Sequence, residues 1–108
     1  MLITAKPCIS VDKQGNVTVF HFNIETLGGG NIESVASEFD SLISEQRPRR
    51  IVIDLGSIHL IDDLGLALIQ SLHDGIEEYG GTAILCHLSP NVDRALREAG
   101  LRHRLHIR

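Results

Sequence analysis

Aromatic residues are scarce in this sequence, whose 108 residues include no Trp, one Tyr and three Phe. Proteins that stack nucleic-acid bases on aromatic side chains, and β-sandwiches with aromatic cores, need more of them. Branched aliphatic residues are abundant instead, because 14 Leu, 13 Ile and 6 Val make up nearly a third of the chain. That share excludes intrinsic disorder and predicts helices packed against a buried sheet.

An excess of positive charge is also missing. Ten Lys and Arg residues stand against fourteen Asp and Glu residues, which gives a formal net charge of −4. General nucleic-acid binders carry a basic face, since neutralised phosphates supply most of their affinity. Here the basic residues gather at positions 47–50 and 102–108 without interleaved aromatic residues. We therefore expect these stretches to be solvated edges and the protein not to bind nucleic acid.

Cysteine is limited to Cys8 and Cys86, each in an apolar run where a free thiol behaves as a small hydrophobic group. A structural disulfide would need a secretory context, and residues 1–7 are too short and weakly apolar for a signal peptide. The most apolar segment, residues 58–72, is interrupted by two aspartates and is not expected to span a membrane. The sequence therefore predicts a soluble, reduced, cytoplasmic protein that forms one domain over residues 1–108.

Alternating and helical apolar patterns predict the element order ββαβαβα. Strands are expected at residues 8–12, 17–22, 51–55 and 82–87, helices at 32–46, 62–79 and 90–99, and a short edge strand at 105–107. Strands followed by helices imply an α/β fold with a mostly parallel sheet and right-handed crossovers.

Capping residues fix the expected ends of these elements. Residues 26–31 are predicted to be a loop whose three glycines tolerate positive φ and which ends at Asn31 as a helix N-cap. Ser89 and Pro90 are typical of a helix start, and Gly100 is typical of a left-handed helix terminator.

The second helix is expected to open at Asp62 and Asp63, where carboxylates accept hydrogen bonds from free N–H groups and face the positive end of the helix dipole. Its predicted apolar stripe consists of Leu64, Leu68, Ile69, Leu72 and Ile76. Two glycines, Gly80 and Gly81, are expected to close it.

Catalytic and metal-binding patterns are not recognisable in the sequence. Adjacent residues such as Asp62 and Asp63 do not face each other on a helix, and the glycines at 28–30 lack the Lys-Ser/Thr ending of a phosphate-binding loop. Cys86 and His87 are neighbours on a predicted strand, so they should point to opposite faces.

The spacing of the histidines does not indicate a metal site either. Only His103 and His106 are closely spaced, and they follow the terminator of the last helix. We expect a binding module without catalytic residues, cofactor or metal, and no particular oligomeric state is predicted.

One motif carries more information. An apolar strand that ends in Asp54 and Leu55 is followed by a short loop and then by Asp-Asp-Leu-Gly-Leu at residues 62–66. This stretch closely resembles the signature of the STAS domain family, whose pattern is Asp-Ser-Ser-Gly-Leu at the start of a helix. Further matches follow at residues 80–81, 86–90 and 99–101. The resemblance implies a mixed four- to five-stranded sheet with three to four helices packed against it.

The family includes bacterial anti-sigma factor antagonists, which dock on an anti-sigma factor kinase through this helix start and are released when the kinase phosphorylates the second serine. In this sequence Asp63 matches the first serine and Leu64 the phosphorylated one, so the usual phosphorylation is impossible. The partner-binding residues implied by the resemblance are Asn31, Asp62, Asp63, Leu64, Gly65 and Leu66.

Three consequences of the leucine compete. The module binds its partner constitutively through an apolar Leu64, or Asp63 mimics a phosphate and prevents binding, or the role is unrelated to sigma factors. Ser57 is a substitute phosphorylation site or, alternatively, an ordinary turn serine.

The expected partner is an anti-sigma factor kinase or a related ATPase. Other members of the family suggest two alternatives, an accessory subunit of a lipid-trafficking ABC transporter and a nucleotide-binding STAS domain.

Overall fold

The computed structural model describes residues 7–108, so the segment considered as a signal peptide lies almost entirely outside the described residues. Its elements are β1 (Ile9–Gln14), β2 (Val17–Phe22), β3 (Thr26–Leu27), α1 (Ile32–Gln46), β4 (Arg50–Asp54), β5 (Leu60–Ile61), α2 (Asp63–Glu78), β6 (Thr82–Cys86) and α3 (Pro90–Glu98). None of the helices in this part of the chain has both the length and the apolar character needed to cross a bilayer.

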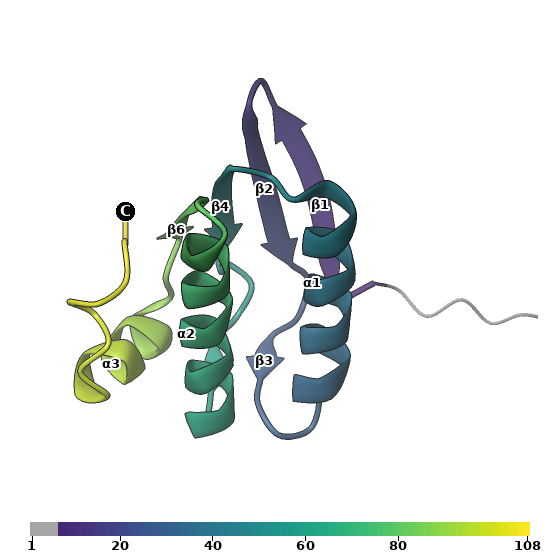
Figure 1. The fold of residues 1–108 in the computed structure, drawn as a ribbon. Helices are drawn as coiled ribbons and strands as arrows, with labels where there is room; N and C mark the ends of the chain where they lie inside the picture. Colours follow the sequence, from purple (N-terminus) through teal and green to yellow (C-terminus); the bar gives the residue numbers. More distant parts are fainter. Residues whose placement is uncertain (1–6) are drawn as a thin grey trace, which may run out of the picture.

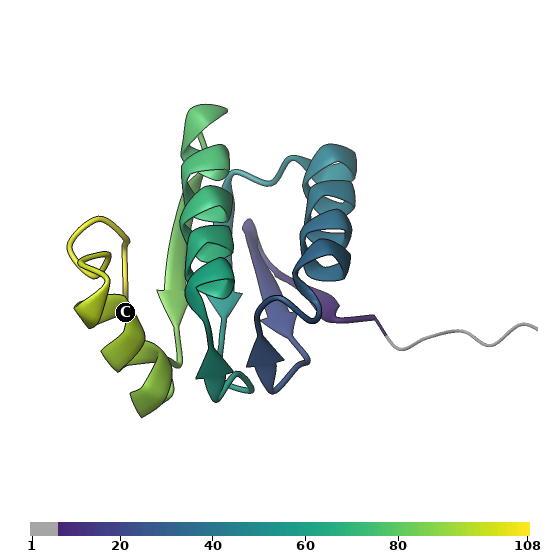
Figure 2. The same ribbon diagram turned by 90° about the horizontal axis from the view of Figure 1, so that it is seen from below.

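The main sheet has four strands in the order β1-β2-β4-β6. β1 and β2 form an antiparallel hairpin, whereas β2, β4 and β6 run parallel. Helices α1 and α2 cover one face of this sheet, and α3 lies beyond the β6 edge (Figures 1 and 2). The predicted α/β fold with a mixed sheet and three helices is confirmed.

Alternation along the strands separates a buried face of the sheet from an open one. On β2, Thr18, Phe20 and Phe22 are buried under the helices, while Val17 and Val19 are half-buried on the other face. The buried face meets Phe39 of α1, whose ring packs edge-on against Phe20 with centroids 5.2 Å apart. The opposite face carries no helix in either view (Figures 1 and 2).

Most predicted ends of elements agree with the structure. The side-chain oxygen of Ser89 accepts a hydrogen bond from Val92 N–H at the start of α3, and Gly80 and Gly100 have φ of +91° and +73° after α2 and α3. The expected strand at 105–107 is reduced to one parallel bridge between Leu85 and Ile107.

Two short strands were not predicted. β3 and β5 form a separate parallel pair in which Thr26 lies opposite Leu60 and Leu27 opposite Ile61. A strand of two residues is too short to show a period-2 pattern, so the sequence alone indicates a loop at β3. This pair matters because it holds the segment that precedes α2 against the segment that precedes α1.

Gly65 on α2 packs directly against this pair. A Cβ at position 65 would overlap the carbonyl oxygen of Leu27 and would lie 2.7 Å from Cγ1 of Ile61. Glycine is therefore required so that α2 can approach β3 and β5.

Two glycines of α2 give a matched stability test. In Gly65→Ala the added methyl group pushes against the Leu27 carbonyl oxygen and the Ile61 side chain. We therefore expect the free energy of unfolding to fall by about 1–3 kcal/mol. Gly75 is exposed on the same helix, and no atom lies within 4 Å of the place that an added Cβ would occupy. Gly75→Ala should therefore raise the free energy of unfolding by about 0.5–1 kcal/mol. Urea unfolding followed by circular dichroism measures both, and equal effects of the two substitutions would contradict the close approach at Gly65.

Candidate functional site

The start of α2 is held by the carboxylate of Asp62. This residue is the N-cap of α2, and its Oδ1 accepts a hydrogen bond from Gly65 N–H at 2.9 Å. Its Oδ2 accepts a second one from Gly29 N–H at 3.0 Å, across 33 residues of sequence. Hydrogen bonds from the Gly29 and Gly65 amides lower the pKa of the Asp62 carboxyl group. One carboxylate therefore joins the glycine loop to the helix.

The glycine loop, residues 28–31, lies close to the start of α2, and this close approach explains its glycine content better than backbone conformation does. The glycines are expected to tolerate positive φ, but none of them adopts it in the structure. A Cβ at Gly28 would overlap the Asp62 carboxylate, and one at Gly29 would lie 3.4 Å from Cδ1 of Leu64. Gly28 therefore allows the loop to approach the helix start, whereas an added Cβ at Gly30 would meet no atom within 4 Å.

Asn31 occupies the N-cap position of α1, as expected, but its side chain does not cap the helix. Its Oδ1 accepts a hydrogen bond from Gly28 N–H at 3.1 Å, and its Nδ2 donates one to the Thr26 carbonyl at 2.7 Å. Asn31 thus closes the glycine loop on itself. The structure brings this loop beside Asp62, so these distant residues of the predicted site lie together.

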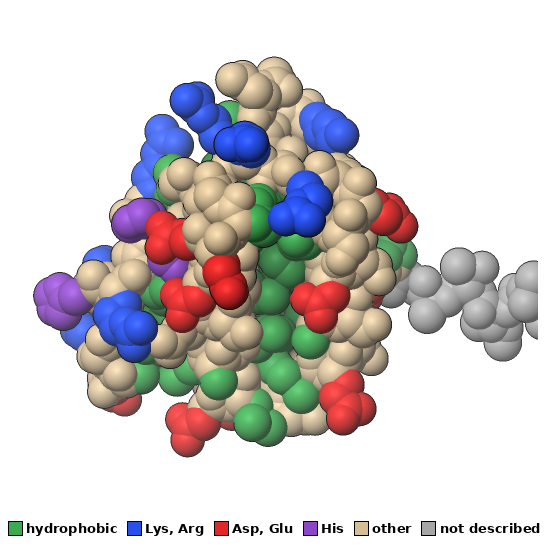
Figure 3. All heavy atoms as spheres, in the orientation of Figure 1, with side chains coloured by type: hydrophobic (Ala, Val, Ile, Leu, Met, Phe, Trp, Pro, Cys, Tyr) green, Lys and Arg blue, Asp and Glu red, His purple; other side chains and the backbone are tan. Residues whose placement is uncertain are grey.

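Leu64 is exposed rather than part of the apolar stripe that helical periodicity predicts. Its side chain is 54% exposed, and Leu60 on β5 is 60% exposed. Both belong to the surface that we call the docking surface: residues 28–31, Leu60, Asp62, Asp63 and Leu64. Hydrophobic side chains reach the solvent at the end of the molecule where α2 begins, with acidic side chains around them (Figure 3).

Gly65 and Leu66 are expected partner-binding residues that the structure buries. Leu66 is 7% exposed and belongs to the core, and Gly65 lies against β3 and β5. Both residues are therefore beneath the docking surface, where they position Leu64 without lying on it.

Ser57 lies in the exposed turn between β4 and β5. The turn is closed by a hydrogen bond from Ile58 N–H to the Leu55 carbonyl at 3.0 Å. This environment is typical of a turn serine.

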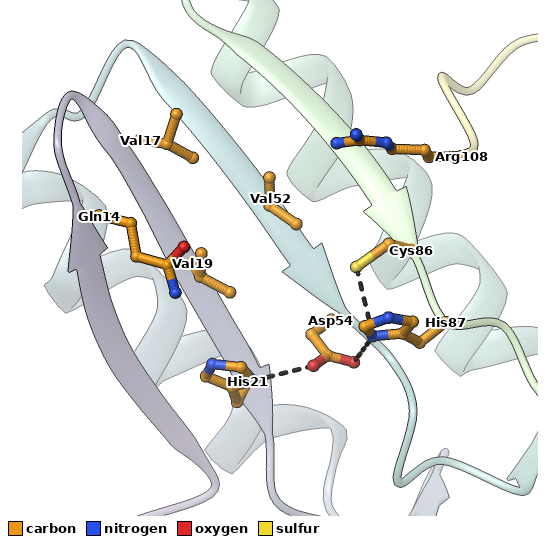
Figure 4. Close-up of a pocket in the computed structure, with 9 residues that line it drawn as sticks. All are labelled: Gln14, Val17, Val19, His21, Val52, Asp54, Cys86, His87 and Arg108. Atoms are coloured by element: carbon orange, nitrogen blue, oxygen red, sulfur yellow. Dashed lines mark hydrogen bonds and ion pairs between the residues drawn. The ribbon is translucent and has the colours of Figure 1, made fainter.

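A second group of polar residues, the carboxyl-edge cluster, consists of His21, Asp54, Cys86 and His87. His21, Asp54 and Cys86 lie directly opposite one another across the parallel strands β2, β4 and β6. Asp54 lies 2.9 Å from Nδ1 of His21 and 3.1 Å from Nδ1 of His87 (Figure 4). The cluster lines a cavity of about 640 Å³ on the open face of the sheet.

The pKa of Asp54 reflects two opposing causes. Partial burial raises the pKa of this carboxyl group, whereas hydrogen bonds from Gly56 N–H, His87 and His21 lower it. The hydrogen bonds outweigh the burial, so the pKa of Asp54 is lowered and the carboxylate stays ionised.

The expectation that Cys86 and His87 point to opposite faces is wrong. His87 lies just beyond β6 with a φ of +58°, so strand alternation no longer applies and its Nδ1 lies 3.7 Å from Sγ of Cys86. The thiol and the Asp54 carboxylate approach the same ring nitrogen, whereas a nucleophile–base–acid relay uses both nitrogens. Burial and the charge of Asp54 also raise the pKa of the Cys86 thiol, which disfavours a reactive thiolate.

One feature of the sequence does indicate this cluster. His21, Asp54 and Cys86 each lie at or next to the carboxyl end of a strand, and such ends meet at one edge of a parallel sheet. Oxygen, nitrogen and sulfur atoms of Asp54, His87 and Cys86 lie within 4.8 Å of one another, close enough to hold a metal ion.

Comparisons with known proteins agree with the fold. The model of a family described as the STAS domain matches residues 9–108. An anti-sigma factor antagonist (STAS) domain protein from Planctomyces limnophilus is 24% identical, with a TM-score of 0.81 over 96% of this chain and 91% of its own.

Two further structures are similar at lower identity. An anti-sigma factor antagonist from Mycobacterium paratuberculosis is 16% identical, with a TM-score of 0.78 over 97% of this chain and 89% of its own. The anti-sigma factor antagonist SpoIIAA in its unphosphorylated form is 17% identical, with a TM-score of 0.73 over 93% of this chain and 87% of its own. At these identities the likeness shows the fold alone.

The Asp62 carboxylate gives a pH-dependent prediction. Asp62→Ala removes two hydrogen bonds at once, so we expect Tm to fall by about 4–8 °C at neutral pH. Because the folded pKa of Asp62 lies below the ordinary value of 3.8, its stabilisation is present above that pH and is lost as the pH falls through the folded pKa. When thermal unfolding is measured at decreasing pH, starting from pH 7, the Tm values of wild type and variant should therefore converge.

Asp63→Ala is the matched control, since the neighbouring carboxylate is exposed and does not cap the helix. We expect a clearly smaller change in Tm. An equal loss in both variants would show that first-turn charge, and not the two Asp62 hydrogen bonds, stabilises this region.

Proposed function

The chain belongs to the STAS domain family, and we propose that it is a regulatory module that binds protein partners in the manner of an anti-sigma factor antagonist. Its partner is an anti-sigma factor kinase or a related ATPase, and it docks through the docking surface at the start of α2. The likeness to anti-sigma factor antagonists of solved structure supports this assignment.

The exposure of Leu64 is the observation that carries the proposal. Full burial of a leucine side chain is worth about 1.5–3 kcal/mol, which corresponds to roughly a tenfold to hundredfold gain in affinity. Leu64 is more than half exposed on a helix whose first turn is fixed by Asp62. Because the backbone at the helix start is already ordered, binding a partner there costs little backbone entropy, and an exposed leucine on it is suited to anchor a partner.

Docking through this surface is constitutive in our proposal. SpoIIAA has been solved in unphosphorylated and phosphorylated forms, so that protein accepts a phosphate. In this chain the position that resembles the phosphorylated serine is Leu64, which has no hydroxyl group. Asp63 is a poor substitute for a phosphate because it carries one charge instead of nearly two and lies one residue earlier.

The module regulates by binding and not by catalysis. In the carboxyl-edge cluster, Cys86 and Asp54 approach the same nitrogen of His87, whereas a catalytic relay uses both ring nitrogens. The raised pKa of the Cys86 thiol also opposes a nucleophilic role. Both cysteines are free, which fits our proposal that the chain acts in the cytoplasm.

Affinity capture tests the docking surface. Immobilised wild-type protein should recover a kinase or another ATPase from extract of its own cells, and Leu64→Glu should reduce recovery at least tenfold, because it places a charge where an apolar contact forms. Ser37→Glu adds the same charge at an exposed position of α1 and should leave recovery unchanged. Circular dichroism checks that both variants fold.

The outcome separates the alternatives. Recovery of neither a kinase nor any other ATPase, or equal recovery by wild type and Leu64→Glu, would contradict the proposal. Recovery of a membrane ATPase would favour the transporter subunit over the anti-sigma pathway.

Phosphate mapping tests whether docking is constitutive. When the captured kinase and ATP are added, mass spectrometry should find no phosphate on the wild-type protein, whereas Leu64→Ser should accept one at residue 64. Phosphate on Ser57 of the wild type would show that control has moved to the preceding turn, and the constitutive proposal would be wrong.

A further inference from the structure

One buried imidazole is left incompletely paired. His73 of α2 is 1% exposed, and among residues 7–108 its Nε2 is the buried side-chain polar atom without a hydrogen-bond partner. Its other nitrogen, Nδ1, lies 3.3 Å from Oδ1 of Asp74. Burying a polar atom without a partner is unfavourable, so native proteins rarely leave one in this state.

Two further donor atoms lie near this nitrogen. Oε2 of Glu77, one helical turn after His73, is 3.9 Å from Nε2. Nδ1 of His106, from the segment after α3, is 3.8 Å from the same oxygen. One ligand atom from each of His73, Glu77 and His106 lies within 4.8 Å of the other two, and the two imidazole rings meet edge to face with centroids 5.3 Å apart.

We propose that His73, Glu77 and His106 form a zinc site that fastens the C-terminal segment to α2. Two imidazoles and one carboxylate are a ligand set that Zn²⁺ takes in proteins, with a fourth position for water. Nothing in the docking surface takes part, so the site is independent of the partner-binding role.

The distances fit a site that tightens when the ion enters. Ligands at about 2.0–2.2 Å in a tetrahedron lie roughly 3.3–3.5 Å from one another. Oε2 of Glu77 lies 3.9 Å from Nε2 of His73 and 3.8 Å from Nδ1 of His106, which exceeds this range by a few tenths of an ångström. The Glu77 side chain is 42% exposed and has the freedom to move by that amount.

The two histidines are held by separate rigid elements. The His106 carbonyl accepts a hydrogen bond from Leu85 N–H at 2.8 Å, which fixes the C-terminal segment to β6. On the helix, a His73 tautomer that donates Nδ1–H to Asp74 leaves the Nε2 lone pair free for the ion. A carboxylate behind a ligating histidine is the usual arrangement around zinc.

Among residues 7–108 the carboxyl-edge cluster is the competing site. There His87 Nδ1 is already hydrogen-bonded to Asp54, so an ion would have to replace an existing interaction. At His73 the ion satisfies a nitrogen that has no partner. The observations therefore favour the site on α2.

Calorimetric titration of the full chain with Zn²⁺, without a polyhistidine tag, tests the proposal. We expect the titration to give one ion per chain. In a separate thermal unfolding experiment, a free Zn²⁺ concentration of about 100 Kd should raise Tm by on the order of 10 °C. His106→Ala, which alters an exposed side chain, should weaken binding at least about tenfold, and Glu77→Gln should weaken it as well. His103→Ala removes an exposed histidine from the same segment and should have no effect.

Co²⁺ and a cysteine variant distinguish the two sites. With Co²⁺ bound to nitrogen and oxygen ligands, the absorption spectrum should show no thiolate-to-metal charge-transfer band, and Cys86→Ser should bind Zn²⁺ as the wild type does. A thiolate band, or binding that is lost in Cys86→Ser and kept in His106→Ala, would move the ion to the carboxyl-edge cluster and overturn the proposal. Absence of stoichiometric Zn²⁺ binding by the wild type would overturn it too.

Discussion

The docking surface depends on one carboxylate that accepts hydrogen bonds from two distant segments. Asp62 caps α2 through Gly65 and holds the glycine loop through Gly29. Because both oxygens are engaged, the first turn of α2 and the loop keep a fixed relation, and glycine is required where each segment meets the carboxylate or the β3–β5 pair. Leu64 takes its outward position from this arrangement, since the buried residues that follow it fix the rotation of the helix.

In our proposal, the same arrangement keeps the docking surface in place although residue 64 has no hydroxyl group. The capping carboxylate, the glycine loop and Gly65 place residue 64 at the exposed helix start whatever its side chain is. A serine there offers a hydroxyl group to a kinase, whereas leucine offers only apolar area. In our account the geometry of a switch is retained, and its chemistry is replaced by a permanent apolar contact.

The sequence predicted the parts of the fold that rest on local rules. Period-2 and period-3.6 patterns located the main strands and helices, and Ser89, Asp62 and Gly100 marked helix ends because capping is local. It did not predict β3 and β5, the role of Gly28, or the meeting of His73 with His106. Those features arise where segments far apart in the chain come together, and a Cβ overlap or an unpaired nitrogen exists only in three dimensions. The pairing of Cys86 with His87 was missed for another reason, since a positive φ at His87 breaks strand alternation.

Site-specific photo-crosslinking is the most direct test of the central claim that residue 64 anchors a partner. A photoreactive amino acid in place of Leu64 should form a covalent adduct with a kinase or another ATPase in living cells, while the same group in place of Ser37 should form none. Adducts from position 37 but not from position 64 would contradict the account, because the partner would then lie on α1 and not at the start of α2.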